Sequence, residues 1–321
     1  MALAQLIKLQ DYISRYQVDA KRYPTQYIRL KKSKWDRLKE EWENPVEFED
    51  QWEDDELIVN ERKTLFQKLN PFKRKEKELA FEVEDEEEHE PQEDPQSDFQ
   101  PQLLFHPKTV GELRRMYMDQ LFSFQLSLAS TTMREKSNID AKYYRSSLLK
   151  DLLMKLPDTF FVMYEPIFLI KKAPVEMGII IITPTECYCI QNIEAEERAT
   201  FTGINSDRFW EKRIGEQMNR VVNPMISLNR MEMIIKALFE QNDVSMKIQK
   251  VVLSRNGYID YPGSSYGVEF IDRRHYENWV EQLQNHHSPM KHMQFKVTET
   301  FLNNVQTTSF MRAEWFTEEG E

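Results

Sequence analysis

GIIIITPTECYCIQNI, residues 178–193, is the stretch that decides the fold of this chain. Its first half contains four consecutive isoleucines, and its second half, after a Thr-Pro-Thr break, runs Glu-Cys-Tyr-Cys-Ile. Isoleucine and tyrosine favour strands because their side chains pack well on a pleated surface, whereas proline interrupts a strand. The stretch therefore predicts the two strands of a buried β-hairpin.

Short apolar runs and helical patterns alternate on both sides of this hairpin. Further strands are predicted within 160–172 (FFVMYEPIFLIKK), 248–255 (IQKVVLSR) and 268–271 (VEFI). Helical periodicity covers 139–156, 226–241 and 275–284. Strands that alternate with helices in this way are typical of a mixed α/β (α+β) domain, with a core sheet flanked by helices.

The first 43 residues carry two apolar patterns at helical spacing, which Pro24 separates. Residues 1–43 are therefore predicted to form an N-terminal helical pair. The second pattern contains an aromatic stripe of Tyr27, Trp35 and Trp42 among lysines and arginines. Such stripes commonly pack on neighbouring helices, but the same residue types also dock proteins, anionic membranes or nucleic-acid backbones. These three aromatic residues are the candidate interaction residues.

The net charge of −11 comes from one segment of the chain. Ten Asp or Glu residues and no Lys or Arg lie between Glu82 and Gln100, which leaves 44 acids against 43 bases elsewhere. Residues 44–102 have too few apolar side chains to form a core and are predicted to be a charged, largely disordered linker. Residues 103–138 are expected to be a helical lead-in with Thr109 as its cap, and residues 286–321 a C-terminal extension.

Composition and motifs argue against several classes of function. The longest apolar runs fall well short of the ~18 residues of a membrane helix, and the N-terminus lacks a signal-peptide pattern. Cys187 and Cys189 are too close on one strand for an ordinary disulfide, which favours reduced thiols and a cytoplasmic location. The chain has no glycine-rich phosphate loop. The histidines His275, His286, His287 and His292 are more typical of helix ends than of a metal site, and Ser264 and Ser265 lack the setting of a hydrolase nucleophile.

Residues 139–285 resemble the nuclease-related domain (NERD) family, which belongs to the restriction-endonuclease-like superfamily. The hairpin at 179–193 matches the spacing of the strand pair in that family, although its turn has no glycine. Trp210, the Asn223-Pro224 pair that opens a helix, the strand at 248–255 and Trp279 stand at similar places. The resemblance implies a restriction-endonuclease-like core sheet, preceded here by the N-terminal helical extension.

The resemblance also implies where a catalytic site would lie. The metal-binding aspartate of the family falls on Gly178, its glutamate on Gln191 and its lysine on Ile193. Phosphodiester hydrolysis by this chemistry needs carboxylates that hold Mg²⁺ or Mn²⁺ and an amine that activates water. All three positions have lost those groups, so the expected site is degenerate.

Two main functions remain as hypotheses. The first is a non-catalytic scaffold without a cofactor that binds a protein partner or a nucleic acid. Membrane attachment through residues 1–43 ranks below both functions. The alternative is a metal-dependent nuclease with relocated residues, for which Glu176, Glu194 and Lys212 (or Arg213) are the candidates. Glu194 is expected to point to the opposite sheet face from Gln191, because side chains alternate along a strand.

Overall fold

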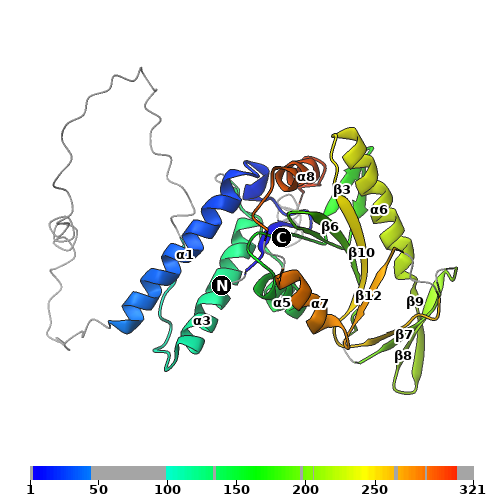
Figure 1. Cartoon of the computed structure of the whole chain (residues 1–321), viewed down its shortest axis with the longest axis horizontal. Coiled ribbons are helices and arrows are strands. Elements are labelled where there is room, and N and C mark those ends of the chain that lie inside the picture. The colour runs from blue at the N-terminus through cyan, green and yellow to red at the C-terminus, as the bar shows by residue number, and fades with distance from the viewer. Residues whose placement is uncertain are drawn as a thin grey trace, which may run out of the picture.

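The computed structural model describes residues 3–44, 99–132, 135–195, 198–204, 206–263, 267–285 and 288–308 (Figure 1). The predicted mixed α/β fold is confirmed. Most of the predicted linker, residues 45–98, lies outside the described residues, and the predicted domain boundaries remain predictions.

Six strands form the main sheet, in the order β1-β2-β5-β6-β10-β12. Their bounds are β1 (Gln5–Leu9), β2 (Phe161–Tyr164), β5 (Ile179–Ile182), β6 (Glu186–Asn192), β10 (Lys247–Ser254) and β12 (Glu269–Asp272). Strand β5 pairs antiparallel with both β2 and β6, whereas the other neighbouring pairs are parallel. Every strand of this sheet except β5 therefore runs in one direction, so the carboxyl ends of the other five strands lie at the same end of the sheet.

The predicted hairpin is the centre of this sheet. Ile179 pairs with Ile190 and Ile182 with Cys187, so the four isoleucines lie directly opposite the cysteine-containing strand. All four isoleucines are buried because helices cover both faces of the sheet. Burial on both faces explains why this strand is a continuous apolar run rather than an alternating one.

The helices form a layer on each face of the sheet. Helix α6 (Pro224–Gln241) packs on β6 and β10, and α8 (His292–Leu302) packs on β5 beside it. The opposite layer contains α3 (Val110–Leu128), α5 (Ser147–Lys155) and α7 (Tyr276–Gln284), with the short α4 (Ala141–Arg145) leading into α5 (Figure 1). Asn223 caps α6, because its side chain accepts from the N–H of Met225 and Pro224 provides the first turn.

Two smaller sheets complete the described strands. Four strands follow the order β11-β7-β8-β9, namely β11 (Tyr258–Asp260), β7 (Thr200–Thr202), β8 (Phe209–Ile214) and β9 (Gln217–Val222). The other two are β3 (Ile167–Ile170) and β4 (Ala173–Glu176), which form an antiparallel pair. Trp210 of β8 is fully buried against Phe270 and Tyr261, which anchors the four-stranded sheet to the main core.

The prediction of the first N-terminal helix is wrong. Residues 5–9 form β1, which pairs in parallel with β2 at the edge of the main sheet, and Arg15–Gln17 form a single 3₁₀ turn, η1. All five residues of β1 are buried, so the strand lacks the alternating pattern that distinguishes a strand from a helix in sequence. The N-terminal segment is therefore part of the main core rather than half of a helical pair.

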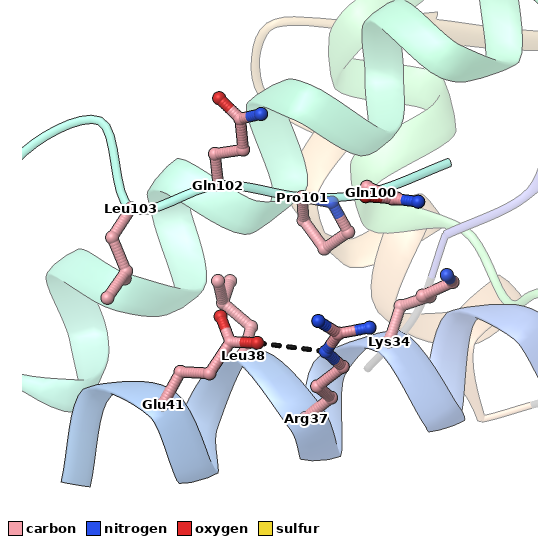
Figure 2. A pocket seen from close by; sticks show the side chains of 8 residues that line it. All are labelled: Lys34, Arg37, Leu38, Glu41, Gln100, Pro101, Gln102 and Leu103. Atoms are coloured by element: carbon pink, nitrogen blue, oxygen red, sulfur yellow. Dashed lines mark hydrogen bonds and ion pairs between the residues drawn. The ribbon is translucent and has the colours of Figure 1, made fainter. Parts of the chain in front are cut away.

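The second predicted N-terminal helix exists as α1 (Arg22–Glu43), and its aromatic stripe packs inward. Tyr27 is fully buried, the Trp35 ring lies 5.4 Å from the Tyr117 ring of α3, and the Trp42 indole donates to the Pro107 carbonyl at 2.8 Å. Residues 100–103 run alongside α1 and border a cavity of about 230 Å³, next to an exposed Arg37–Glu41 ion pair (Figure 2). The three candidate interaction residues therefore pack within this chain: Tyr27 in the core, Trp35 against α3 and Trp42 against the segment before α3.

Candidate functional site

A pocket of about 370 Å³ lies at the edge of the main sheet where the carboxyl ends of β1, β2 and β6 meet. Open α/β sheets bind ligands most often at such an edge. The residues that line it come from those strand ends, from the β4–β5 connection and from the first turns of α6: Gln10, Glu165, Glu176, Met177, Gly178, Ile179, Gln191, Asn192, Ser227 and Arg230. The pocket thus contains two of the three positions at which the resemblance implies catalytic groups.

Gly178 leaves no room for a carboxylate at the first of these positions. A Cβ added to Gly178 would lie 2.3 Å from the carbonyl oxygen of Ile190, a distance that real Cβ atoms do not adopt. Its N–H donates to the sulfur of Met231 at 3.4 Å, so α6 also closes over this backbone. The absence of an aspartate here is therefore built into the packing of β5 on β6.

The other two positions also lack catalytic groups. Gln191 is half-buried in the pocket and donates from its amide to the Asn192 carbonyl at 3.3 Å. Ile193 continues the pairing of β6 with β10, since its N–H donates to the Leu253 carbonyl at 2.9 Å. An amide offers one neutral oxygen to a hard cation, and an isoleucine offers none.

Two carboxylates nevertheless line the pocket. Glu176, one of the candidate relocated ligands, stands at the end of β4, and Glu165 follows β2. Burial raises the pKa of Glu165, the charge of Glu176 raises it further and Lys142 opposes both effects. Sequence reasoning missed Glu165, although a glutamate directly after the apolar run FFVMY is an available signal.

The backbone beside these carboxylates is strained. Glu165 has φ of 50° and Gln10 has φ of 38°, both in the left-handed region that residues with a side chain rarely adopt. Such conformations cost about 1–3 kcal/mol each and persist only where the surrounding structure imposes them. Both strained residues lie at carboxyl ends of neighbouring strands and line the same pocket.

The cation of this pocket is Arg230, which sequence reasoning also missed. Arg230 is exposed on α6 and is the basic residue among those that line the pocket. The candidates Lys212 and Arg213 lie instead on β8, where they pair with Phe201 and Thr200 of β7 in the four-stranded sheet. An arginine stays protonated in proteins, so Arg230 can stabilise negative charge but cannot accept a proton from water.

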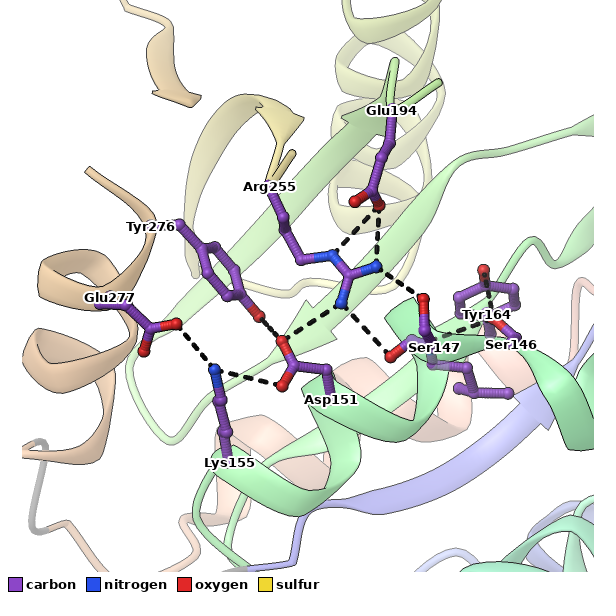
Figure 3. Close-up of polar contacts among 10 residues, drawn as sticks. Ser146, Ser147, Asp151, Lys155, Tyr164, Glu194, Arg255, Tyr276 and Glu277 are labelled. Atoms are coloured by element: carbon purple, nitrogen blue, oxygen red, sulfur yellow. Dashed lines mark hydrogen bonds and ion pairs between the residues drawn. The ribbon is translucent and has the colours of Figure 1, made fainter. Parts of the chain in front are cut away.

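Glu194, the remaining relocated candidate, takes part in a separate network on the other face of the sheet (Figure 3). Its carboxylate accepts from Arg255 Nε at 3.1 Å and from Nη2 at 2.9 Å. Arg255 also pairs with Asp151 at 3.3 Å. Lys155 in turn pairs with Asp151 at 3.2 Å and with Glu277 at 2.9 Å. This chain of alternating charges joins the ends of β6 and β10 to α5 and α7.

The placement of Glu194 agrees with the expected alternation of side chains along the strand. Gln191 faces α6 and the pocket, whereas Glu194 faces α5 and α7. Of the three relocated candidates, only Glu176 lines the pocket, and Glu194 and Lys212 lie on other parts of the molecule.

The other residues considered from the sequence do not add to this site. His292 begins α8, and His275 precedes α7 with its Nδ1 3.1 Å from an oxygen of Asp272. His286, His287, Ser264 and Ser265 lie outside the described residues. Cys187 and Cys189 are buried and free. Among the described ranges, no three or more His, Cys, Asp or Glu side chains are grouped so that they could hold a metal ion.

The arrangement restricts what the pocket can do chemically. Glu165, Glu176 and Gln191 supply oxygen ligands of the type that Mg²⁺ or Mn²⁺ accepts. Among the described residues that line the pocket, the amine that would activate water has no counterpart, because the one basic residue is an arginine. In the part of the chain that the structure describes, no helix is both long and apolar enough to cross a bilayer.

Comparisons with known proteins add one short local similarity. A stretch of 41 residues is 49% identical to part of a protein described as an RNA 2′,3′-cyclic phosphodiesterase from Geobacillus stearothermophilus. The match covers 13% of this chain and 13% of that protein, so the similarity spans only about an eighth of either length. No model of a protein family matches the chain, and no solved structure matches it.

Proposed function

We propose that this chain is a non-catalytic interaction protein built on a degenerate nuclease-related domain, and that its partner is a protein. The observation that carries the proposal is Gly178, whose contact with the Ile190 carbonyl excludes any side chain at the position of the metal-binding aspartate. A site that had merely lost one carboxylate could keep space for a water or a ligand there. Here the backbone itself occupies that space.

The order of the elements supports the same assignment. The resemblance expects a strand pair, then a helix opened by Asn-Pro, then a late strand and a helix that bears a tryptophan. The chain has β5 and β6, then α6 opened by Asn223 and Pro224, then β10 parallel to β6, and then α7 with Trp279. Trp279 packs edge-on against Tyr188 of β6, which joins the last of these elements to the hairpin.

The location and the other partners belong to the same proposal. The buried, free cysteines fit a reducing compartment, so we place the protein in the cytoplasm. Binding of a nucleic acid is a weaker expectation, because bases and acids are nearly balanced outside the acidic segment. A membrane role is the weakest expectation, because Tyr27, Trp35 and Trp42 already pack within the chain.

One observation favours the alternative, a metal-dependent nuclease. Glu165 and Glu176 line one pocket with Arg230, and burial raises the pKa of Glu165, so that this carboxylate is the candidate proton acceptor. Under this alternative, Glu176 and Gln191 would hold Mg²⁺ or Mn²⁺, and the ion would polarise a phosphodiester. Arg230 would stabilise charge on the phosphate.

A cleavage assay separates the two functions. The purified chain is incubated with supercoiled, linear and single-stranded DNA and with RNA, in Mg²⁺ or Mn²⁺, beside a chelator control. We expect no cleavage by the folded protein. Glu176→Ala and Glu165→Gln test the pocket, and Glu240→Gln, an exposed carboxylate in the last turn of α6, is the matched control. Cleavage that disappears with the chelator and both pocket variants, but persists in the control, would establish the nuclease.

A further inference from the structure

Among the residues that the structure describes, strand β9 has a neighbouring strand on one side only and forms an open edge of the four-stranded sheet. It pairs with β8 on one side and is the last strand in the order β11-β7-β8-β9. Five of its six residues are exposed, with Met218 at 59% and Val222 at 63% of their full exposure, and Val221 is half-buried. In Figure 1, β8 and β9 lie on the side of the molecule away from α1, with their hairpin extending outward.

The backbone groups that face this open edge can be identified. Beyond the end of β9, the N–H of Asn223 donates to the Arg208 carbonyl at 3.1 Å, so residue 223 points its backbone toward β8. Because backbone groups alternate in direction along an antiparallel strand, residues 217, 219 and 221 also point toward β8. The N–H and C=O groups of Met218, Arg220 and Val222 therefore face outward.

The same three residues expose their side chains on one face of the hairpin. Met218 pairs with Arg213, Arg220 with Glu211 and Val222 with Phe209, and all six side chains are exposed. On β9 this face therefore presents an apolar side chain at each end and Arg220 at its centre, with Glu211 opposite Arg220 and Arg213 opposite Met218 on β8. It carries two arginines against one glutamate, so its net charge is positive although the whole chain is acidic.

This edge has few of the features by which proteins protect a strand from pairing, and the one charged side chain on β9 is that of Arg220. Natural edge strands carry proline, inward-pointing charges or lysines, or a bulge that twists the edge away. Strand β9 has no proline and no lysine, and its register with β8 runs without a shift from Phe209–Val222 to Ile214–Gln217. Gly215, with φ of 56°, lies in the tight turn that joins β8 directly to β9.

Charge decides what kind of strand fits beside β9. Two copies of β9 could pair antiparallel through their outward-facing backbone groups. If Met218 of one copy lies opposite Val222 of the other, then Arg220 lies directly opposite Arg220 of the other copy. The next usable register would place Met218 opposite Arg220, with the two copies of Arg220 on diagonal positions. Like charges opposite one another destabilise a strand pair. A strand with an acidic residue at its centre avoids this repulsion.

We propose that β9 binds an extended segment of a protein partner with the pattern apolar–x–acidic–x–apolar, which adds a strand to the four-stranded sheet. The partner's acidic side chain lies beside Arg220, and its apolar side chains lie beside Met218 and Val222. Main-chain hydrogen bonds supply affinity and the alternate side chains supply specificity, as in other proteins that bind peptides by strand addition. This inference rests on the proposed function, since it identifies the surface and partner class of the interaction protein.

Two labelled peptides test the proposal by fluorescence anisotropy with the full chain. The acidic probe is fluorescein-Ser-Val-Thr-Glu-Thr-Val-Ser, and the basic probe carries lysine in place of glutamate. We expect the acidic probe to bind at least tenfold more tightly than the basic probe. We expect Arg220→Glu to reverse this preference.

Backbone pairing is tested separately from charge. Met218→Pro removes an outward N–H and leaves the hydrogen bonds to β8 in place, whereas Met218→Ala is the matched control that keeps the N–H. We expect the proline variant to lose binding at least tenfold and the alanine variant to retain most of it. Circular dichroism verifies that each variant is folded. An acidic probe with N-methylated amides blocks pairing without any change in the protein, and we expect it not to bind.

Several outcomes would overturn the proposal. These are no binding of the acidic probe up to 1 mM, equal binding of both probes, or unchanged binding to Met218→Pro or by the N-methylated probe. Light scattering provides one more outcome of this kind. If the wild type is a dimer and Met218→Pro is a monomer, then the β9 edge binds a second copy of this chain rather than a different partner. The cleavage assay on the same preparation keeps the two proposals apart. A peptide that fails to bind leaves the non-catalytic assignment standing, whereas cleavage overturns that assignment whatever the peptide does.

Discussion

Arg255 is the residue whose replacement should reveal how strongly the charge network holds α5 and α7 to the ends of β6 and β10. Its guanidinium donates twice to Glu194, once to Asp151, and to both the hydroxyl and the carbonyl of Ser147 at 3.0 and 3.3 Å. The Arg255→Met variant keeps most of the apolar stem and removes all these donors. Glu194 would then be left as a carboxylate without its main partner.

The expected cost follows from the burial of the groups involved. The side chains of Arg255 and Glu194 are each 14% exposed and that of Asp151 is 22% exposed. Breaking a fully buried pair costs about 3–5 kcal/mol, and the remaining exposure reduces this to about 3 kcal/mol. For a folded region of this size, that loss lowers the melting temperature by about 6–12 °C. Arg255→Lys keeps the charge without the fork and should lose about half as much.

Urea unfolding, followed by circular dichroism and tryptophan fluorescence, measures the free energy of unfolding of each variant. Arg37→Met is the matched control, since Arg37 pairs with Glu41 at 2.8 Å on an exposed face of α1 and should cost no more than about 0.5 kcal/mol. A loss below about 1 kcal/mol for Arg255→Met, or equal stability of the lysine variant and the wild type, would refute the reasoning. The network would then be a surface feature rather than a support of the fold.

Two further predictions concern single positions in or beside the main sheet. Burial lowers the pKa of Lys8 to about 7, against an opposing effect of Asp11, so between pH 7 and 10.5 the unfolded chain holds a proton that the native state has lost. The free energy of unfolding of the wild type, measured relative to Lys8→Met, should therefore rise by about 1.4 kcal/mol per pH unit across that range. Urea titrations at several pH values measure this difference, and a difference that stays flat or falls as the pH rises would contradict the prediction. Gly178→Asp restores the carboxylate expected from the resemblance, but the Ile190 carbonyl should make it destabilising by about 3 kcal/mol or more. Gly111→Asp, where the nearest atom to an added Cβ is 3.7 Å away, should be nearly neutral, and an equally stable Gly178→Asp protein would show that the hairpin can open there.

Local chemistry determined much of the fold from the sequence alone. Four isoleucines, a proline break and a second apolar run gave the hairpin that became β5 and β6, because branched side chains favour extended backbone wherever the segment lies. The Asn223-Pro224 pair likewise determined the start of α6, since the cap and the first turn need only neighbouring residues. Glu194 was correctly assigned to the opposite face from Gln191, because the period of a strand is local.

Contacts between distant segments decided the rest. Strand β1 became a strand because it pairs with β2, about 150 residues later, and burial of all its side chains removed the pattern that would have distinguished it from a helix. Glu165, Glu176 and Arg230 share a pocket only because the carboxyl ends of β1, β2 and β6 align beside α6. The position of a side chain along its own helix or strand can be read from sequence spacing. Which side chains meet across elements depends on strand order and packing, which the sequence does not display.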